Sequence, residues 1–319
     1  MREAGELAGF FHALSDVSRL RIVQLVRTME LTVGELCQVL GQSQPRVSRH
    51  VRILDEAGIV RRRREGSWTF VEIPRGPVAG LLEPLVAAVA GAHDREIFTT
   101  DLKRLGAVRD DREAAASRWF DSRADRWEAV RALHAGEDVI EAALAKALGR
   151  GSLGTLVDVG TGTGRMIELF APRATRAIGI DRSPDMLRLA RVRLDKADAA
   201  PAQLLQGDMN ALPLDDGVAD TLILHLVLHY AASPAAALAE AARVLKPGGR
   251  LLLVDFAEHD REELRRIHGH QRLGFSDAQV EDRFTEVGLE LAAVATVPGD
   301  PLEVRLWTAR RPAKEAEAA

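Results

Sequence analysis

Several features are scarce in this 319-residue sequence, and each scarcity excludes a class of structure. The single cysteine, Cys37, cannot form a disulfide bond within the chain. Charged residues break the longest apolar runs, so we expect no membrane span and a cytoplasmic protein. The formal net charge is only −4, so the chain as a whole gives no signal for a polyanionic partner. Its length suffices for two domains, and its 46% hydrophobic content fits a globular protein.

Positive charge is nevertheless concentrated between Gln42 and Arg64. This stretch contains seven arginines against two acidic residues, Asp55 and Glu56, a local balance of +5. A basic cluster on a slightly acidic chain is typical of a nucleic-acid-binding surface. The alternative is a solvated, charged helix in a protein–protein module.

Residues 1 to about 75 have the pattern of short helices followed by a β-hairpin. Thr32 can cap one helix, with Glu35 in the capping-box position, and Ser43 can cap the next. The helix after Ser43 has an apolar stripe formed by Val47, Val51 and Leu54. Residues 59–64 and 68–73 then have the pattern of a hairpin. The order predicts a mainly α-helical, winged helix-turn-helix domain.

These motifs closely resemble the arsenic-repressor (ArsR/SmtB) family. The matching stretches are Ala13-Leu14-Ser15-Asp16, Arg19-Leu20-Arg21-Ile22, Ser43-Gln44, Val47-Ser48-Arg49-His50, Leu54-Asp55-Glu56-Ala57-Gly58 and Arg63-Arg64-Glu65-Gly66. The resemblance implies a regulator that binds a double-stranded DNA operator. It also implies a homodimer formed through the apolar helix expected at residues 78–92, which would place two recognition helices on a palindromic site.

With its apolar stripe buried, the helix after Ser43 presents its polar residues outward. Residues near the start of such a helix meet base edges in the major groove, where Gln44 and Arg46 can contact adenine and guanine. The remaining polar residues suit phosphates, which position the protein without specifying sequence. We expect His50 to be packed or phosphate-facing. The DNA-binding residues that we predict are Gln44, Arg46, Ser48, Arg49, Arg52, Arg62 and Arg63.

Metal sensing, a property of the resembled family, is not expected here. Arsenic sensors pair cysteines on the helix that contains Cys37, which is alone in this chain. His93 and Glu96 could supply one end of a zinc site, but Gly80 and Leu82 stand where the partners would be expected. We therefore predict no metal site.

The second part of the chain is organised around a glycine-rich stretch, Thr155-Leu-Val-Asp-Val-Gly-Thr-Gly-Thr-Gly164. Its apolar start is typical of a buried strand, and glycines at every second position then allow a sharp turn and close approach of a ligand. A helix that begins near Arg165 would point its N-terminus at that ligand. The spacing Asp-x-Gly-x-Gly-x-Gly differs from the Gly-x-Gly-x-x-Gly of dinucleotide enzymes.

Three further motifs follow in order: Gly179-Ile180-Asp181, Gln206-Gly207-Asp208-Met209 and Leu245-Lys246-Pro247-Gly248-Gly249-Arg250. Together with the glycine-rich stretch they resemble class I S-adenosylmethionine (SAM) methyltransferases of the small-molecule kind that includes the ubiquinone-biosynthesis enzymes. The resemblance covers roughly residues 118–310. It implies an α/β Rossmann-like class I methyltransferase fold with a seven-stranded sheet, SAM as cofactor and S-adenosylhomocysteine as product. The implied cofactor-binding residues are Asp158, Gly160, Thr161, Gly162, Gly164, Asp181, Arg182, Asp208, Met209 and His225.

Candidates for a catalytic base lie where the sheet strands end. His229 and Tyr230 follow the expected fourth strand and could face a substrate, although both could equally pack a helix. Asp255 and His259, after the fifth strand, are comparable candidates. No cysteine nucleophile is present in this part of the chain, and no Asn/Asp-Pro-Pro-Tyr motif follows strand four, so DNA methylation is disfavoured. We predict a small-molecule methyl acceptor.

These observations predict four segments: a DNA-binding and dimerisation domain at 1–98, a helical linker at 99–117, a methyltransferase domain at 118–311 and a disordered tail at 312–319. Trp119, Phe120 and Trp127 could close over the cofactor or simply pack on the sheet. The predicted function is an ArsR-type regulator with a methyltransferase domain that is active on a small molecule. The alternative is a non-catalytic repressor of methionine-cycle genes that senses SAM or S-adenosylhomocysteine.

Overall fold

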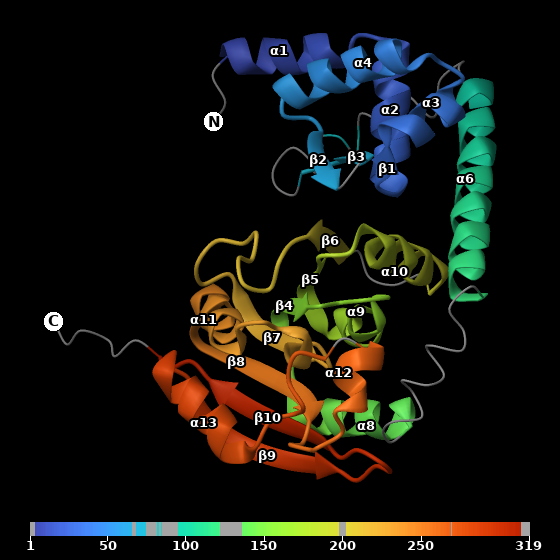
Figure 1. The fold of residues 1–319 in the computed structure, drawn as a ribbon. Coiled ribbons are helices and arrows are strands. Elements are labelled where there is room, and N and C mark those ends of the chain that lie inside the picture. Colours follow the sequence, from blue (N-terminus) through green and yellow to red (C-terminus); the bar gives the residue numbers. More distant parts are fainter. Residues whose placement is uncertain are drawn as a thin grey trace, which may run out of the picture. The chain divides into compact units, whose positions relative to one another are not determined.

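The computed structural model describes residues 4–65, 68–74, 82, 84, 95–121, 136–197, 202–268 and 270–313. The chain divides into two compact units, Met1–Ala115 and Ala116–Ala319 (Figure 1). The predicted dimerisation helix at 78–92 lies outside the described residues except for positions 82 and 84, and so do Trp127 and residues 314–319.

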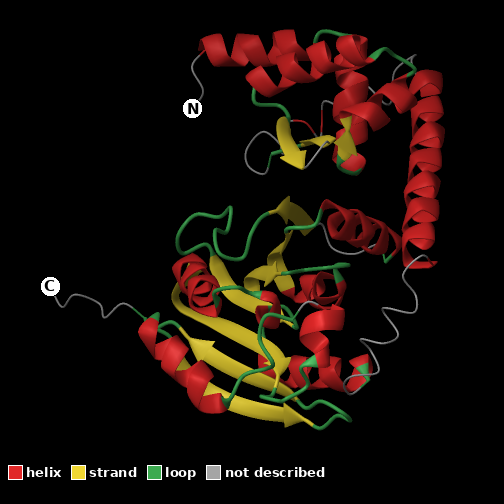
Figure 2. Cartoon of the chain, viewed as in Figure 1, coloured by secondary structure: helices red, strands yellow, loops and turns green. Residues whose placement is uncertain are grey.

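The N-terminal unit combines helices with one small sheet, as Figure 2 shows. Its helices are α1 (Ala4–Leu14), α2 (Val17–Thr28), α3 (Val33–Leu40), α4 (Gln44–Glu56) and the long α6 (Arg95–Asp121), whose last six residues belong to the second unit. Its strands are β1 (Leu31–Thr32), β2 (Arg61–Glu65) and β3 (Trp68–Glu72), in the antiparallel order β1-β3-β2. This arrangement confirms the predicted helix-turn-helix and hairpin; the short β1 was not predicted.

Local sequence signals set the helix boundaries of this unit. The Thr32 hydroxyl accepts a bond from the Glu35 N–H at 3.1 Å, and the Glu35 carboxylate accepts one from the Thr32 N–H at 2.7 Å. This is the predicted capping box. Ser43 precedes α4 as predicted, but its side chain makes no capping bond. The apolar stripe of α4 is buried: Val47, Val51 and Leu54.

The segment 99–117, predicted as a helical linker, lies within α6. Leu105 and Val108 of this helix are buried in the same core as α2, α3 and α4. The Asp101 carboxylate accepts two bonds of 2.6 Å from the Arg21 guanidinium. The Arg112 guanidinium donates bonds of 2.7 and 2.8 Å to the Glu35 carboxylate. Through residue 115, α6 is therefore part of the N-terminal unit.

The C-terminal unit is built on a seven-stranded sheet of order β6-β5-β4-β7-β8-β10-β9. The strands are β4 (Gly154–Val159), β5 (Ala174–Asp181), β6 (Ala202–Gln206), β7 (Ala219–His225), β8 (Leu245–Phe256), β9 (Glu290–Val297) and β10 (Val304–Arg310). Strands β4 to β8 are parallel, whereas β10 runs antiparallel to both neighbours. This topology confirms the predicted Rossmann-like methyltransferase fold.

Helices cover both faces of this sheet. They are α8 (Glu137–Leu148), α9 (Arg165–Phe170), α10 (Pro184–Lys196), α11 (Pro234–Val244), α12 (Glu263–His268) and α13 (Asp277–Glu286), with two short 3-10 turns, η1 (Ala171–Arg173) and η2 (Leu228–Tyr230). Alternate strand residues enter two separate cores: Leu222 and Leu224 pack with α11 and α13, and Ile223 packs with α8, α9 and α12. Because strands buried on both faces are apolar throughout, the sequence shows continuous apolar runs here.

Within the described ranges, no helix combines the length and the apolar character that crossing a membrane requires.

Candidate functional site

The predicted ligand-binding residues of the C-terminal unit gather at one edge of the sheet. The glycine-rich loop follows β4, while Asp181 ends β5, Asp208 follows β6, and His225 ends β7. Because these strands are parallel, their carboxyl ends share one edge. In open α/β sheets this edge, at the point where strand order reverses, is where ligands bind.

Two glycines of the loop differ in the space that surrounds them. Gly160 has φ 73° and packs so closely against Val227 that an added Cβ would lie 2.3 Å from its Cγ2 atom. Gly162 has φ 52°, but a Cβ there would meet nothing closer than the Gly160 carbonyl oxygen at 4.0 Å. The first glycine therefore holds the loop against the segment after β7, and the second leaves an open surface for a ligand.

Asp158 lies beneath the loop and is 1% exposed. Its Oδ2 atom accepts a bond from the Thr161 hydroxyl at 2.6 Å, while Oδ1 has no hydrogen-bond partner among the described residues. Burial raises the pKa of this carboxyl to about 7, and the charge of Asp181 adds to the rise, although the Thr161 bond opposes it. An unsatisfied buried acceptor is the feature that a bound cationic or hydrogen-donating group would complete.

Asp181 is held against the same loop. Its two oxygens accept bonds from the Gly162 N–H at 2.9 Å and the Ser183 N–H at 2.8 Å. Burial raises the pKa of this carboxyl, and the backbone N–H groups partly offset that rise. Each oxygen has a second lone pair, so the carboxylate can also accept bonds from ligand hydroxyls. The neighbouring Arg182 is exposed, and its carbonyl accepts a bond from the Gln206 amide at 3.2 Å.

The remaining predicted cofactor residues flank this group. The Asp208 Oδ1 atom accepts two bonds of 2.8 Å, from the backbone N–H and the amide of Asn210. Met209 is partly buried against the sheet core, and His225 is half-buried at the end of β7. All the predicted cofactor residues therefore belong to the loops and strand ends at this one edge.

A histidine–aspartate pair occupies the same edge, at the ends of β7 and β8. His229 lies in η2 and is 2% exposed, and Asp255 is fully buried. The Nδ1 atom of His229 is 2.7 Å from Asp255 Oδ1, and the His229 N–H donates to Asp255 Oδ2 at 3.0 Å. Asp255 Oδ1 also accepts a bond from the Phe256 N–H at 2.8 Å. The predicted candidates His229 and Asp255 thus form one bonded unit.

The chain reaches η2 through a left-handed residue, Leu226, with φ 50°. Residues other than glycine rarely adopt this conformation, and such strain often occurs at functional sites. Neither it nor the pairing across β7 and β8 had a local sequence signal. The sequence does indicate that Asp255 could belong to the site, because it follows an apolar run, as Asp181 does.

Aromatic rings surround the His229 imidazole. Ring centroids lie 4.1 Å away for Tyr230, 4.2 Å for His270 and 5.1 Å for Phe256. His270 is 3% exposed, whereas Tyr230 is 41% exposed and forms the outer wall. The segment that carries His270 is bound to η2, because the N–H groups of Gln271 and Arg272 donate to the His229 carbonyl at 2.9 and 3.0 Å.

In the N-terminal unit, the predicted residues of α4 form one exposed face. Gln44, Arg46, Ser48, Arg49 and Arg52 are all exposed, beside a buried stripe. His50 belongs to the buried side and lies 3.8 Å from the Asp16 carboxylate. Burial lowers the pKa of His50, which favours a packed, neutral imidazole. The geometry of α4 is therefore suited to the predicted DNA contacts.

The predicted wing arginines are not equivalent. Arg62 is bonded to Asp55 at 2.8 Å, and its side chain is 45% exposed. Arg63 donates two bonds of 3.0 Å to the Glu30 carboxylate, stacks on Phe70 and has a side chain only 15% exposed. Arg63 therefore holds the hairpin to the segment between α2 and β1, a structural role that its position in an arginine run did not reveal.

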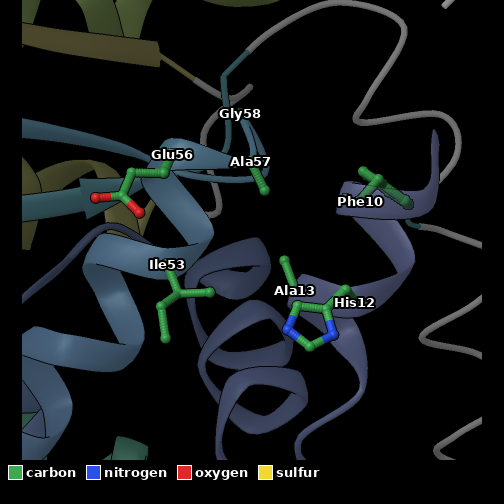
Figure 3. Close-up of a pocket in the computed structure, with 8 residues that line it drawn as sticks. Phe10, His12, Ala13, Ile53, Glu56, Ala57 and Gly58 are labelled. Carbon is green, nitrogen blue, oxygen red and sulfur yellow. The ribbon is translucent and has the colours of Figure 1, made fainter. Parts of the chain in front are cut away.

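A hollow of about 620 Å³ lies elsewhere in the N-terminal unit, between α1 and the end of α4. Figure 3 shows Phe10, His12 and Ala13 on one side and Ile53 and Glu56 on the other. None of the predicted DNA-binding residues lines it.

Two family models match the chain. One describes a methyltransferase domain and covers residues 157–253, and the other describes bacterial regulatory proteins of the arsR family and covers residues 16–62. Both matches agree with the structural units described above.

Individual relatives are similar to parts of the chain. A demethylmenaquinone methyltransferase of Thermobifida fusca is 34% identical over 163 residues, which is 50% of this chain and 68% of that enzyme. An uncharacterised 37.1 kDa protein in transposon TN4556 of Streptomyces fradiae is 45% identical over 94 residues, 30% of this chain and 26% of that protein. The demethylmenaquinone methyltransferase of Tropheryma whipplei is 37% identical over 102 residues, 32% of this chain and 41% of the enzyme. The chain thus spans less than half the length of several of its curated relatives.

Among solved structures, a SAM-dependent methyltransferase from Aquifex aeolicus is 23% identical, with a TM-score of 0.46. The match covers 54% of this chain and 88% of that one.

Proposed function

Because the chain belongs to the methyltransferase family that includes the Thermobifida enzyme and carries an arsR-family domain before it, we propose a DNA-binding regulator with an active methyltransferase domain. Its cofactor is SAM, its product S-adenosylhomocysteine, and its acceptor a small molecule. The observation that carries this proposal is the acid-lined, open glycine loop at the strand ends.

The residues of this site suit SAM. The molecule carries positive charge on its sulfonium and its ammonium group, and the buried Asp158 Oδ1 offers an acceptor with no partner among the described residues. Asp181 can accept the ribose hydroxyls, and the open surface at Gly162 admits close approach. Asp208 is available at the adenine edge. SAM supplies an electrophilic methyl group, so the protein mainly has to position the acceptor and remove its proton.

The exposed face of α4 supports binding to double-stranded DNA. Gln44 and Arg46 lie at the start of this helix, where recognition helices meet base edges, and Ser48, Arg49 and Arg52 lie farther along it. A homodimer would bind a palindromic operator with two such helices. α1 presents apolar side chains outward, with Leu7 44% and Phe11 53% exposed, as a surface that pairs with another chain would. A regulator of this kind acts in the cytoplasm.

A second function, ligand-dependent control of DNA binding, is favoured by α6. The helix runs without a break from Arg95 to Asp121, and its first part is bonded to α2 and α3 through Asp101 and Arg112. SAM and S-adenosylhomocysteine could shift the affinity for the operator only if they bind one conformation of the protein more tightly than another. A sensor of this kind needs no catalytic base.

Calorimetry on the intact chain tests the cofactor assignment. We expect SAM and S-adenosylhomocysteine to bind and NADH not to bind. Gly162→Val should abolish binding, because its side chain fills the open surface. Gly217→Val is the matched control, because Gly217 has a similar positive φ of 63°, a Cβ there meets nothing within 4 Å, and the residue lies before β7, at the opposite end of the strands from the loop. A heat of binding with NADH and none with SAM would overturn the cofactor assignment.

Selection from a random DNA pool tests the regulator assignment. We expect the intact chain to enrich a palindromic sequence, and Arg46→Ala to lose preference at one base pair of each half-site. Absence of any enriched sequence would show that α4 is a solvated helix without a DNA-reading role.

A further inference from the structure

We infer that His229, oriented by Asp255, is the general base that deprotonates a hydroxyl group on an aromatic acceptor, so that the chain is an O-methyltransferase. The inference rests on the proposed methyltransferase function. It assigns a substrate class and a positioning role to Asp255, and it follows from the bonding of the pair, its place in the fold and the rings around it.

The bonds of Asp255 determine which nitrogen of His229 is basic. The Asp255 carboxylate accepts the His229 and Phe256 backbone N–H groups, so its orientation is fixed from two sides. An ionised carboxylate can only accept, and therefore the His229 Nδ1 atom, 2.7 Å away, carries the proton. In a neutral imidazole the other nitrogen, Nε2, then has the lone pair that a base requires.

The position of the pair connects it to the glycine loop. Strand β7 is the direct neighbour of β4, and η2 follows β7. Leu226 joins β7 to η2 with a left-handed φ of 50°, and the next residue, Val227, packs on Gly160 of the loop. The segment that leads to His229 is therefore packed against the loop that would bind the cofactor, and backbone strain of this kind is concentrated at functional sites.

A general base is needed for some kinds of methyl acceptor and not for others. A neutral amine has a lone pair ready for attack, and a thiol ionises easily, whereas a hydroxyl group must lose its proton as it reacts. A positioned base typically contributes about 10²- to 10⁴-fold to such a step. The rings of Tyr230, Phe256 and His270 pack around the imidazole, and the exposed ring of Tyr230 offers a flat surface on which an aromatic acceptor can stack. The exposed side of Tyr230 is where the acceptor would enter.

In the transfer step, the acceptor oxygen forms a bond to the methyl carbon of SAM. The bond between that carbon and sulfur breaks, and its electron pair stays on sulfur. The hydroxyl proton moves to Nε2 of His229. The resulting imidazolium is stabilised by the Asp255 carboxylate and later releases the proton to water.

Four other titratable groups face or approach His229. Asp255 approaches it from β8, Tyr230 from η2, and His270 and His259 from the segment after β8. Burial lowers the pKa of His259, and the charges of Arg261 and His229 add to this, although Asp260 and Glu263 oppose it; the net shift favours the neutral imidazole. Among these groups, Asp255 is the one that is hydrogen-bonded to the imidazole and can stabilise it when it accepts the proton.

The test measures transfer of isotopically labelled methyl from SAM to substituted phenols and catechols, with matched anilines and thiophenols. We expect hydroxyl compounds to be methylated. His229→Gln should lower kcat by about 10²-fold or more for a weakly acidic phenol. It should lower kcat far less for 4-nitrophenol, which ionises without help. Asp255→Asn should lower kcat more than it raises KM, whereas the exposed Asp260→Asn should match the wild type.

Ring-nitrogen NMR of the ligand-free protein supplies a readout that does not depend on turnover. We expect His229 to carry its proton on Nδ1, and Asp255→Asn to disturb that tautomer while backbone spectra show an intact fold. An Nε2–H tautomer in the wild type overturns the inference. So does SAM binding without methylation of any hydroxyl compound, preferential methylation of anilines or thiophenols, or an equal loss for 4-nitrophenol and weakly acidic phenols. Failure to bind SAM at all would instead refute the proposed function itself.

Discussion

Replacement of Asp158 by asparagine should change how the stability of the C-terminal unit depends on pH. The carboxyl is buried, and its pKa is raised from 3.8 to about 7. Between these values the folded protein holds a proton that the unfolded chain has released. Stability therefore falls as pH rises through this window, by roughly 1.4 kcal/mol for each pH unit. The loss is nearly complete about one pH unit above the folded pKa.

The size of the expected loss of stability depends on how much of this pH window the experiment covers. Between pH 5 and pH 8, about two pH units lie below the folded pKa, so the wild type should lose roughly 3 kcal/mol from this group. Asp158→Asn cannot lose a proton, and its amide oxygen can still accept the Thr161 bond. Any constant cost of the amide cancels when the two pH values are compared. For a unit of this size the difference corresponds to roughly 10 °C in melting temperature.

Thermal melting of both proteins from pH 5 to pH 8 measures this effect, with the exposed Asp260→Asn as control. The asparagine variant should lose less stability than the wild type as pH rises. SAM affinity should also rise over this range in the wild type, since an ionised Asp158 attracts a cationic ligand, and should stay flat in the variant. Parallel melting curves for the variant and the wild type would refute the reasoning.

Three other predictions concern DNA binding and coupling. Arg46→Ala should weaken operator binding by about 1–3 kcal/mol in fluorescence anisotropy and relax specificity at one base pair. Arg63→Ala should lower the melting temperature of the N-terminal unit more than Arg62→Ala does, because Arg63 is the more buried and holds Glu30; equal melting with uniformly weaker DNA binding would contradict this. If the chain is a sensor, SAM and S-adenosylhomocysteine should alter operator affinity unequally, by roughly 5- to 150-fold, and Asp181→Ala should abolish the response while DNA binding without ligand persists.

Features encoded by neighbouring residues were predictable from the sequence. The Thr32–Glu35 capping box needs only residues three apart, and it forms as predicted. The glycine loop and the acids at the strand ends are likewise local motifs, and their resemblance to methyltransferases indicated the seven-stranded sheet. These signals work because the residues of each motif lie close together in the sequence.

Pairings between distant residues were not predictable. Arg63 looks like a phosphate contact in sequence, because nothing local shows that Glu30, which is 33 residues earlier in the chain, will bind it. The polar segment 99–117 conceals Leu105 and Val108, whose burial depends on helices far earlier in the chain. His229 and Asp255 are 26 residues apart and meet only because β7 and β8 are neighbours. In each case tertiary packing decides the role of the side chain.

The central claim is that the C-terminal unit transfers a methyl group from SAM to a small molecule. The most direct measurement incubates the intact chain with methyl-labelled SAM and a small-molecule cell extract, and identifies labelled products by mass spectrometry. We predict a labelled small molecule with the wild type and with Gly217→Val, and none with Gly162→Val. If SAM binds but the label enters no small molecule, the unit is a sensor and the claim is wrong.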